Sequence, residues 1–418
     1  MGIINENVDK VDIRVKQKKK DLIDYFIRER EGSNIKNREV FSLEYIPKEI
    51  YHREDYIFWL LEKMGNIDRF RNNLNIWGPV GCGKTLVVKY SISHLQDMWK
   101  DLNITAKIVY VNCNEYSTSS SVLYKIITSL GGEVAERGLR LGTYIAHLKE
   151  IIEDLTALVI CLDEVDFLIT RRRNKKKGYE EVLYSFGEIN KINLICISNI
   201  PKWNQFLDDR IRSRLQLENK NFAAYSESET RDIILQRIEL GLKDSKIFSD
   251  KHIDYIVKTI LINKTDIRDA IRYLQIIVDY LDKNEVEVSK HILNKCYNIL
   301  IEEELFSTIN SLSIAHKILI WIISSLAIKK KKITSNLINT RWNELASNDK
   351  FEYKEYIKPI GVRQIQRHIN TLTELYQLLS SNTASLGRYG KENVITPEFD
   401  AELVHDHYKL DDRINSSI

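Results

Sequence analysis

The sequence predicts an α/β domain in which helices cover a parallel sheet, followed by an α-helical lid and a C-terminal winged helix. Three observations predict this class. Apolar stretches typical of buried strands alternate with helical patterns from residue 73 to residue 198. A purely helical region follows from about residue 225. Three helical stretches and a basic hairpin then close the chain. We expect four parts: an N-terminal extension over 1–39, the α/β domain over 40–222, the lid over 223–309 and the winged helix over 310–418.

Length and composition limit the classes of protein to consider. A chain of 418 residues is long enough for several hydrophobic cores, and 43% hydrophobic with 29% charged residues are typical of a globular protein. The five cysteines have neither CxxC nor zinc-site spacing, so we expect buried thiols in a reducing compartment. The longest apolar run, over residues 318–328, is too short to span a bilayer. We therefore expect a cytoplasmic protein without a membrane partner.

Residues 78–85 read GPVGCGKT and match the phosphate-loop pattern in full. Its glycines let successive backbone N–H groups converge on phosphate oxygens, and the helix that follows points its positive end at the same anion. Lys84 supplies a charge for the β- and γ-phosphates, and Thr85 supplies a hydroxyl for Mg²⁺. We expect this segment to bind ATP or ADP through Val80, Gly81, Cys82, Gly83, Lys84 and Thr85.

The elements around this loop follow in a regular order. A helix over about 54–64 precedes the first strand, and buried strands over 105–113, 157–162 and 193–198 come after the loop. Helical patterns separate these strands. Because a βαβαβ alternation builds parallel strands, we expect a parallel sheet that is covered on both faces.

Two of these strands end in polar residues that suit phosphate chemistry. Asp163 and Glu164 follow a buried strand, at the edge where open α/β sheets bind their ligands. Asp163 would hold Mg²⁺ through water, and Glu164 would polarise the water that attacks the γ-phosphate. Asn199 ends the next strand, where its amide would orient that water or contact the γ-phosphate. An isolated Asn at a strand end is more often a turn former, but the neighbouring motifs favour the functional interpretation.

The sequence contains two strongly basic segments, and each of them allows two interpretations. Residues 171–177 hold six cations among seven residues, and four lysines lie between residues 16 and 20. Like charges at this density repel one another, so they are either solvated or paired with a polyanion such as DNA. The residues alone leave both interpretations open.

The last part of the chain is strongly basic. Residues 311–391 hold thirteen lysines and arginines against five acids, a net charge of +8 in a chain of +3. Helical stretches over 313–328, 334–346 and 362–375 precede two strands around residues 383–391. Three helices and a hairpin make a winged helix, and the local charge favours duplex DNA over a protein as its partner.

Within the third of these helices, one face is apolar and the rest is polar. Arg363, Gln364 and Arg367 lie off the apolar face, and they are residue types that contact base edges and phosphates in a major groove. Arg388 lies between Gly387 and Gly390 at the tip of the hairpin, which suits a narrow minor groove. We expect these four polar residues, Arg363, Gln364, Arg367 and Arg388, to bind DNA.

With these parts in order, residues 40–395 closely resemble the archaeal replication initiators related to the origin recognition complex and the cell-division-control loader protein, within the AAA+ ATPases. Many weak marks in the right order carry the resemblance. They are Tyr45-Ile46-Pro47 with His52-Arg53-Glu54, the loop at 78–85, Asp163-Glu164, Asn199, the segment 207–215, Tyr225 with Arg237, Arg268 and the winged helix.

The resemblance implies roles for individual residues. His52, Tyr225 and Arg237 would lie around the nucleotide, and Asn199 and Arg268 would be the two sensors of its γ-phosphate. Arg210 would be the arginine finger that reaches a neighbour's ATP, although Arg214 occupies the corresponding position of the clamp-loader pattern. The region around 117–142 would be the helical insertion that touches duplex DNA. Two departures are Thr265, where the family usually has glycine, and the long basic loop at 171–177.

The resemblance also implies a function. The chain would be an ATP-dependent origin-recognition protein that binds specific duplex DNA, associates with the chromosome and helps recruit or load the replicative minichromosome-maintenance helicase. A paralogous initiator is a further partner. ATP, with Mg²⁺, would act mainly as a switch with weak ATPase activity. A paralogous transcription regulator is the alternative. A clamp loader is disfavoured because it carries a helical collar in place of the winged helix, and a signal-transduction ATPase is disfavoured by Arg268 and the insertion.

Overall fold

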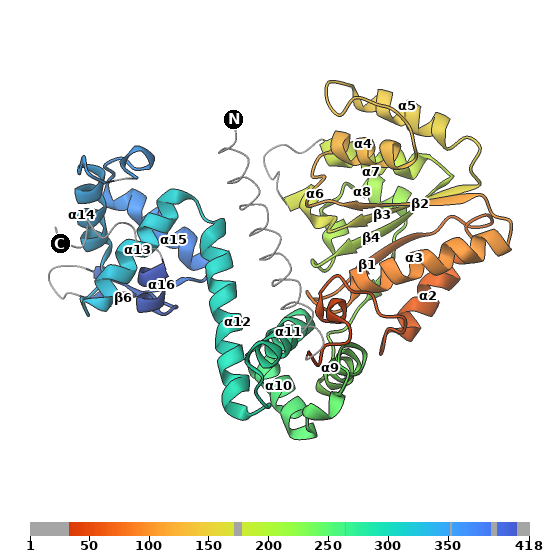
Figure 1. Cartoon of the computed structure of the whole chain (residues 1–418). Coiled ribbons are helices and arrows are strands. Elements are labelled where there is room, and N and C mark those ends of the chain that lie inside the picture. The colour runs from red at the N-terminus through yellow and green to blue at the C-terminus, as the bar shows by residue number, and fades with distance from the viewer. Residues whose placement is uncertain (1–32, 171–177, 264, 352, 386–390, 408–418) are drawn as a thin grey trace, which may run out of the picture. The chain divides into compact units, whose positions relative to one another are not determined.

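The structure is a computed structural model that describes residues 33–170, 178–263, 265–351, 353–385 and 391–407 (Figure 1). The chain forms two compact units, the first ending at Cys296 and the second beginning at Tyr297. The four-part division expected from the sequence stays a prediction. Of the described helices, none combines the length and the hydropathy that a bilayer crossing requires.

The centre of the first unit is a parallel five-stranded sheet with the strand order β2-β3-β4-β1-β5. Its register places Asn112 opposite Asp163, and Trp77 opposite Ser198. The carboxyl ends of β1, β3 and β4 therefore meet at one edge, which is the edge that carries the predicted site residues. The strands are β1 (Asn73–Trp77), β2 (Ala106–Asn112), β3 (Ala157–Asp163), β4 (Ile192–Ser198) and β5 (Glu218–Asn221).

Helices cover both faces of this sheet, as the alternation of elements predicts (Figure 1). Alternate residues of β3 show the two faces: Ile160 packs into the core beneath α4, α5, α7 and α8, whereas Cys161 packs into the core beneath α2 and α3. All five cysteines are buried and free, as expected. The covering helices are α2 (Glu54–Gly65), α3 (Lys84–Asp101), α4 (Ser119–Ser129), α5 (Leu141–Ile151), α7 (Gly178–Glu188) and α8 (Asp209–Leu215), with the short α6 (Asp166–Thr170).

A helical lid completes the first unit. Its helices begin at polar caps: Ser226 and Asp266 each accept a hydrogen bond from a backbone N–H group of the following turn. The segment that contains Phe41, before α2, packs against this lid. The Phe41 ring fills the space beside Gly241, where a β-carbon would lie 2.3 Å from the ring. The lid helices are α9 (Glu227–Gly241), α10 (Asp250–Ile262), α11 (Ile267–Asn284) and the first part of α12 (Lys290–Ser311).

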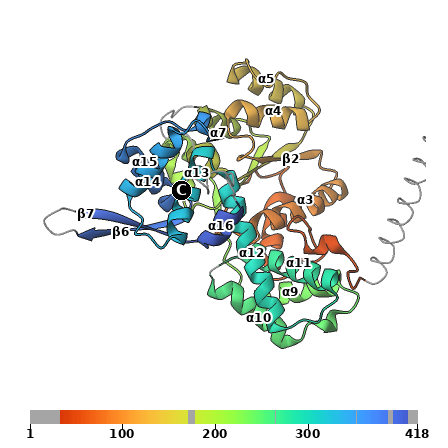
Figure 2. The same cartoon turned by 60° about the vertical axis from the view of Figure 1, so that its left-hand side comes forward.

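The second unit has the winged-helix arrangement. Helix α15 buries Ile365, Ile369 and Leu372 against the core of the unit, as its sequence pattern predicts. The hairpin β6–β7 is antiparallel and extends away from the helices of this unit (Figure 2). The elements are α13 (Ile314–Ile328), α14 (Ser335–Ala346), α15 (Val362–Glu374), β6 (Leu379–Ser385), β7 (Lys391–Pro397) and α16 (Ala401–His407). The predicted fold class is confirmed. Helix α16 was not expected from the sequence, and neither was β5 in the first unit.

Candidate nucleotide-binding site and DNA-binding surface

A cavity of about 620 Å³ lies where the sheet edge faces the lid helices α9 and α11. Residues far apart in the sequence line it, and they include most of the residues that the sequence singles out. His52 and Arg210 are the predicted nucleotide-site residues that do not line it. Those that do are Val80, Gly81, Cys82, Gly83, Lys84, Thr85, Asp163, Glu164, Asn199, Tyr225, Arg237 and Arg268.

The phosphate loop needs glycine at two positions. Gly81 and Gly83 have φ angles of +75° and +89°, in the left-handed region that side chains disfavour. Neighbouring side chains also leave no space, because a β-carbon would lie 2.3 Å from Cγ of Asp266 at Gly81, and 2.7 Å from the Tyr225 hydroxyl at Gly83. Gly83 precedes α3 and gives it no side-chain cap. The cap position therefore offers no side-chain acceptor to the first N–H groups of α3, as in an anion site at a helix N-terminus.

Lys84 is held inside this loop. Its side chain is only 6% exposed, and Nζ donates hydrogen bonds to the carbonyl oxygens of Gly78 at 2.9 Å and Pro79 at 2.7 Å. The loop therefore fixes a cation at the start of α3, beside the N–H groups of the helix.

Asp163 accepts hydrogen bonds from three directions. The Thr85 hydroxyl donates to Oδ2 at 2.8 Å, the Tyr110 hydroxyl donates to the same oxygen, and the N–H of Glu164 donates to Oδ1 at 2.9 Å. Burial and the Asp163 charge raise the pKa of Tyr110, so its hydroxyl stays protonated. A hydroxyl and a carboxylate side by side are the oxygen donors that Mg²⁺ prefers, so Thr85 and Asp163 fit that ion.

Glu164 has a strained backbone and a perturbed carboxyl group. Its φ angle is +53°, which is uncommon for a residue with a β-carbon. Burial and the charges of Asp163 and Asp166 raise the pKa of its carboxyl group, and Arg268 partly offsets this. The turn that carries it is tied to β4, because Ser198 Oγ donates to Asp166 Oδ1 at 2.8 Å. The acidic turn and Asn199 are thus held at one end of the sheet.

Arg237 of helix α9 also lines the cavity, where it contacts Val40 and Tyr45. The Arg237 guanidinium is buried and donates hydrogen bonds to the carbonyl oxygens of Val40 at 2.6 Å and Tyr45 at 3.3 Å. It also lies over the Tyr45 ring, with 5.0 Å between Cζ and the ring centroid. Its Nε atom has no partner among the described residues. Burial lowers the pKa of this guanidinium to about 10.

The Arg268 side chain is linked to the phosphate loop through the carboxylate of Asp266. Its Nη2 atom donates to Oδ2 of Asp266 at 2.9 Å, and the Asp266 side chain lies against Gly81. This bond is the main reason why the pKa of Arg268 is raised. Helix α11 of the lid and the phosphate loop are therefore adjacent at this point.

His52 and the segment around Arg210 are arranged differently. His52 Nε2 lies 2.9 Å from Oδ2 of Asp232 on α9. Arg210 is exposed on α8, and its side chain has no hydrogen bond or ion pair within the part of the chain that the structure describes. Arg214, by comparison, pairs with Glu188 and also lies against Tyr184.

The predicted DNA-binding residues lie in the second unit. Arg363, Gln364 and Arg367 are exposed on α15, on the side away from its buried residues. Neither arginine has an ion pair with any described residue. Arg388 and the basic residues 171–177 lie outside the described residues, so their roles stay predictions.

Two residues of the site were not predicted as functional: Tyr110, which had no expected role, and Arg53, which stood out only as part of a motif. Tyr110 belongs to an apolar strand, where a core position is the ordinary expectation. Its hydroxyl reaches Asp163 because β2 and β3 pair in parallel, with Tyr110 opposite Cys161. The strand register is therefore the signal that could have identified it.

The strand order and the loop-and-acid site define an AAA+ nucleotide-binding protein. The comparisons with known proteins agree, since a family model described as an AAA domain matches residues 68–198. ORC1-type DNA replication protein 1 of Sulfurisphaera tokodaii is 27% identical over 396 residues, covering 92% of this chain and 95% of that protein.

Two solved structures share the fold. The Aeropyrum pernix ORC1 protein, solved in complex with DNA, has a TM-score of 0.76 and 23% identity, covering 92% of this chain and 100% of that one. The Aeropyrum pernix ORC2 protein, solved in ADPNP–ADP complexes, has a TM-score of 0.56 and 21% identity, covering 90% of this chain and 98% of that one. These structures show that the fold is shared, and the similarity to the ORC1-type protein along almost the whole chain confirms the resemblance to the archaeal replication initiators.

Proposed function

We propose that this protein is an ATP-dependent replication initiator that binds specific duplex DNA at origins and helps recruit or load the minichromosome-maintenance helicase. The observation that carries the proposal is the convergence of the phosphate loop, Asp163, Glu164, Asn199 and Arg268 on one cavity. The similarity to ORC1-type proteins along almost the whole chain supports the replication role. We keep the four-part domain division as part of this proposal.

In this proposal the chain's own groups bind and orient the triphosphate. Lys84 and the N–H groups at the start of α3 bind the phosphates, and Tyr225 and Arg237 lie beside the rest of the nucleotide. Thr85 through its hydroxyl and Asp163 through water would hold Mg²⁺, which would supply charge neutralisation at the phosphates. Glu164 accepts a proton from the attacking water, and Asn199 orients that water.

Hydrolysis is completed by a neighbouring copy or a paralogous initiator. Arg210 suits an arginine finger, because it is exposed and without an ion pair among the described residues, whereas Arg214 is already paired with Glu188. Finger arginines supplied by a neighbour accelerate hydrolysis by about 10³–10⁵-fold, so the isolated chain is expected to be a weak ATPase.

The nucleotide acts as a switch through the lid. Asp266 caps the N-terminus of α11, Arg268 lies in its first turn, and the Asp266 side chain lies against the phosphate loop at Gly81. A bound γ-phosphate repels the Asp266 carboxylate and attracts the Arg268 guanidinium, so it changes the position of the lid. Helix α12 connects the lid to the winged helix, and this continuity carries the change toward DNA.

The DNA surface in this proposal is helix α15 together with the hairpin. Arg363, Gln364 and Arg367 read or contact the major groove, and Arg388 enters the minor groove. The affinity falls with salt by about 0.9 log units per log unit of salt for each phosphate neutralised.

The test is chromatin mapping of the full-length protein in its host. The proposal predicts that the protein occupies replication origins on the chromosome and that the helicase occupies the same sites. Occupancy of scattered promoters without the helicase would overturn it and favour the transcription-regulator alternative, because a regulator built on this scaffold keeps every motif described above.

A further inference from the structure

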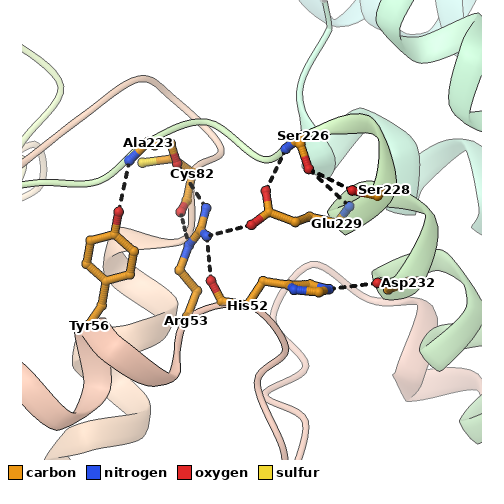
Figure 3. Close-up of polar contacts among 9 residues, drawn as sticks. All are labelled: His52, Arg53, Tyr56, Cys82, Ala223, Ser226, Ser228, Glu229 and Asp232. Atoms are coloured by element: carbon orange, nitrogen blue, oxygen red, sulfur yellow. Dashed lines mark hydrogen bonds and ion pairs between the residues drawn. The ribbon is translucent and has the colours of Figure 1, made fainter.

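Arg53 lies where three segments of the first unit meet (Figure 3). Its side chain is 3% exposed, at the start of α2. Nε donates to the carbonyl oxygen of Cys82 in the phosphate loop at 3.1 Å, and Nη2 donates to that of Ala223 at 2.9 Å. Nη1 donates to the carbonyl oxygen of His52 at 2.6 Å. The guanidinium thus joins the phosphate loop to the connector between sheet and lid.

The same guanidinium also reaches the lid. Nη1 lies 4.0 Å from Oε1 of Glu229 on α9, and Cζ lies 3.6 Å from the centroid of the Tyr225 ring. Glu229 belongs to the cap of α9, because Oε2 accepts a hydrogen bond from the N–H of Ser226 at 2.7 Å (Figure 3). That bond and Arg53 both lower the pKa of Glu229, so its carboxylate stays charged.

A guanidinium suits this junction better than any other cation. Its planar fork presents donors in fixed directions, so acceptors that it holds together keep a fixed geometry relative to one another. A lysine ammonium can satisfy fewer of these acceptors at once. The guanidinium lies over the Tyr225 ring, and the hydroxyl of that ring would be only 2.7 Å from a β-carbon at Gly83. A displacement of the phosphate loop therefore reaches Arg53 and Tyr225 directly.

We propose that Arg53 is a positioning residue that transmits the state of the phosphate loop to α9 of the lid. Its guanidinium couples the Cys82 carbonyl, the connector at Ala223 and the cap of α9 at Glu229. A loop that rearranges around a bound triphosphate moves these acceptors as one group, and α9 follows. The inference rests on the proposed binding of ATP at the phosphate loop, and it adds a route by which the bound phosphates act on the lid.

The test measures hydrogen–deuterium exchange of residues 226–241 in the full chain, with and without a saturating non-hydrolysable ATP analogue. Arg53→Lys keeps the charge but removes the fork, and Glu229→Gln keeps the fork but removes the ion pair to the lid. The matched control is Arg71→Lys. Arg71 donates to the carbonyl oxygens of Phe186, Gly187 and Ile192, all inside the α/β part of the unit.

The analogue is expected to slow exchange of α9 by about tenfold in the wild type and in Arg71→Lys. Arg53→Lys is expected to bind the analogue within about tenfold of the wild-type affinity while losing most of this protection. Glu229→Gln is expected to lose part of it. Full protection of α9 in Arg53→Lys would overturn the role of Arg53 but leave the proposed function standing. An equal loss of this protection in Arg71→Lys would do the same. If the wild type bound the analogue without any change in the exchange of α9, both the proposed nucleotide switch and the role of Arg53 in it would be overturned.

Discussion

Replacing Lys84 with alanine is expected to abolish ATP binding. The ammonium group lies inside the phosphate loop, at the start of α3, and the residue is only 6% exposed. Hydrogen bonds from a charged donor contribute about 1.5–3 kcal/mol each. Removing two of them to the phosphates corresponds to roughly a 10²–10⁴-fold loss of affinity.

Titration calorimetry with ATP measures this loss. The matched control is Lys100→Ala, in the last turn of the same helix, where the side chain is 77% exposed and pairs with Asp97. The control is expected to bind ATP like the wild type. Unchanged ATP affinity in Lys84→Ala, in a variant that keeps its circular dichroism spectrum, would remove the assignment of the site.

Replacing Glu164 with glutamine is expected to leave ATP binding nearly intact and to reduce hydrolysis by about 10²–10⁴-fold, the usual contribution of a general base. Glutamine keeps the shape of the side chain but cannot accept a proton from water. Single-turnover hydrolysis of labelled ATP measures the effect, because it detects slow reactions. Glu150→Gln, an exposed position on α5, is the control.

Glu164 also predicts a pH dependence. The base is active only when deprotonated, and burial together with Asp163 and Asp166 raises its pKa above the usual 4.5. The rate of hydrolysis should therefore be at its maximum above the raised pKa and should fall as the pH drops through it. This loss should occur at a higher pH than for an unperturbed carboxyl group. Persistent hydrolysis in Glu164→Gln would assign the base to another residue.

The motifs of the site were predictable because each is local in the sequence. Residues 78–85 carry their own geometry, and Asp163 is recognised by the apolar strand before it. The structure brings both to one cavity because parallel strands share their carboxyl edge. Helix α11 of the lid and helix α15 of the winged helix were predictable for a similar reason, since their apolar periodicity is strong.

Other features depend on interactions that the sequence does not display. Strand β5 has the sequence Glu-Asn-Lys-Asn, which lacks an apolar pattern because an edge strand is held mainly by backbone pairing with β1. Arg53 bonds to Cys82 and Ala223, which lie 29 and 170 residues away, so no local pattern predicts its role. His52 was expected beside the nucleotide from resemblance alone; the structure shows its contact with Asp232, and its role at the nucleotide stays a prediction.

The central claim is that the nucleotide at the phosphate loop controls how the winged helix binds DNA. The most direct measurement is the binding and footprint of the purified full chain on its origin duplex in three states: nucleotide-free, with ADP, and with a non-hydrolysable ATP analogue. A variant with Arg363→Ala and Arg367→Ala serves as the control for the DNA surface. It is expected to bind more weakly in every state, with a salt slope that is smaller by about 0.9 for each phosphate that the variant no longer neutralises.

For the wild type we predict an affinity and a footprint that differ between the ATP state and the other two. Identical affinity and identical footprints in all three states would contradict the account.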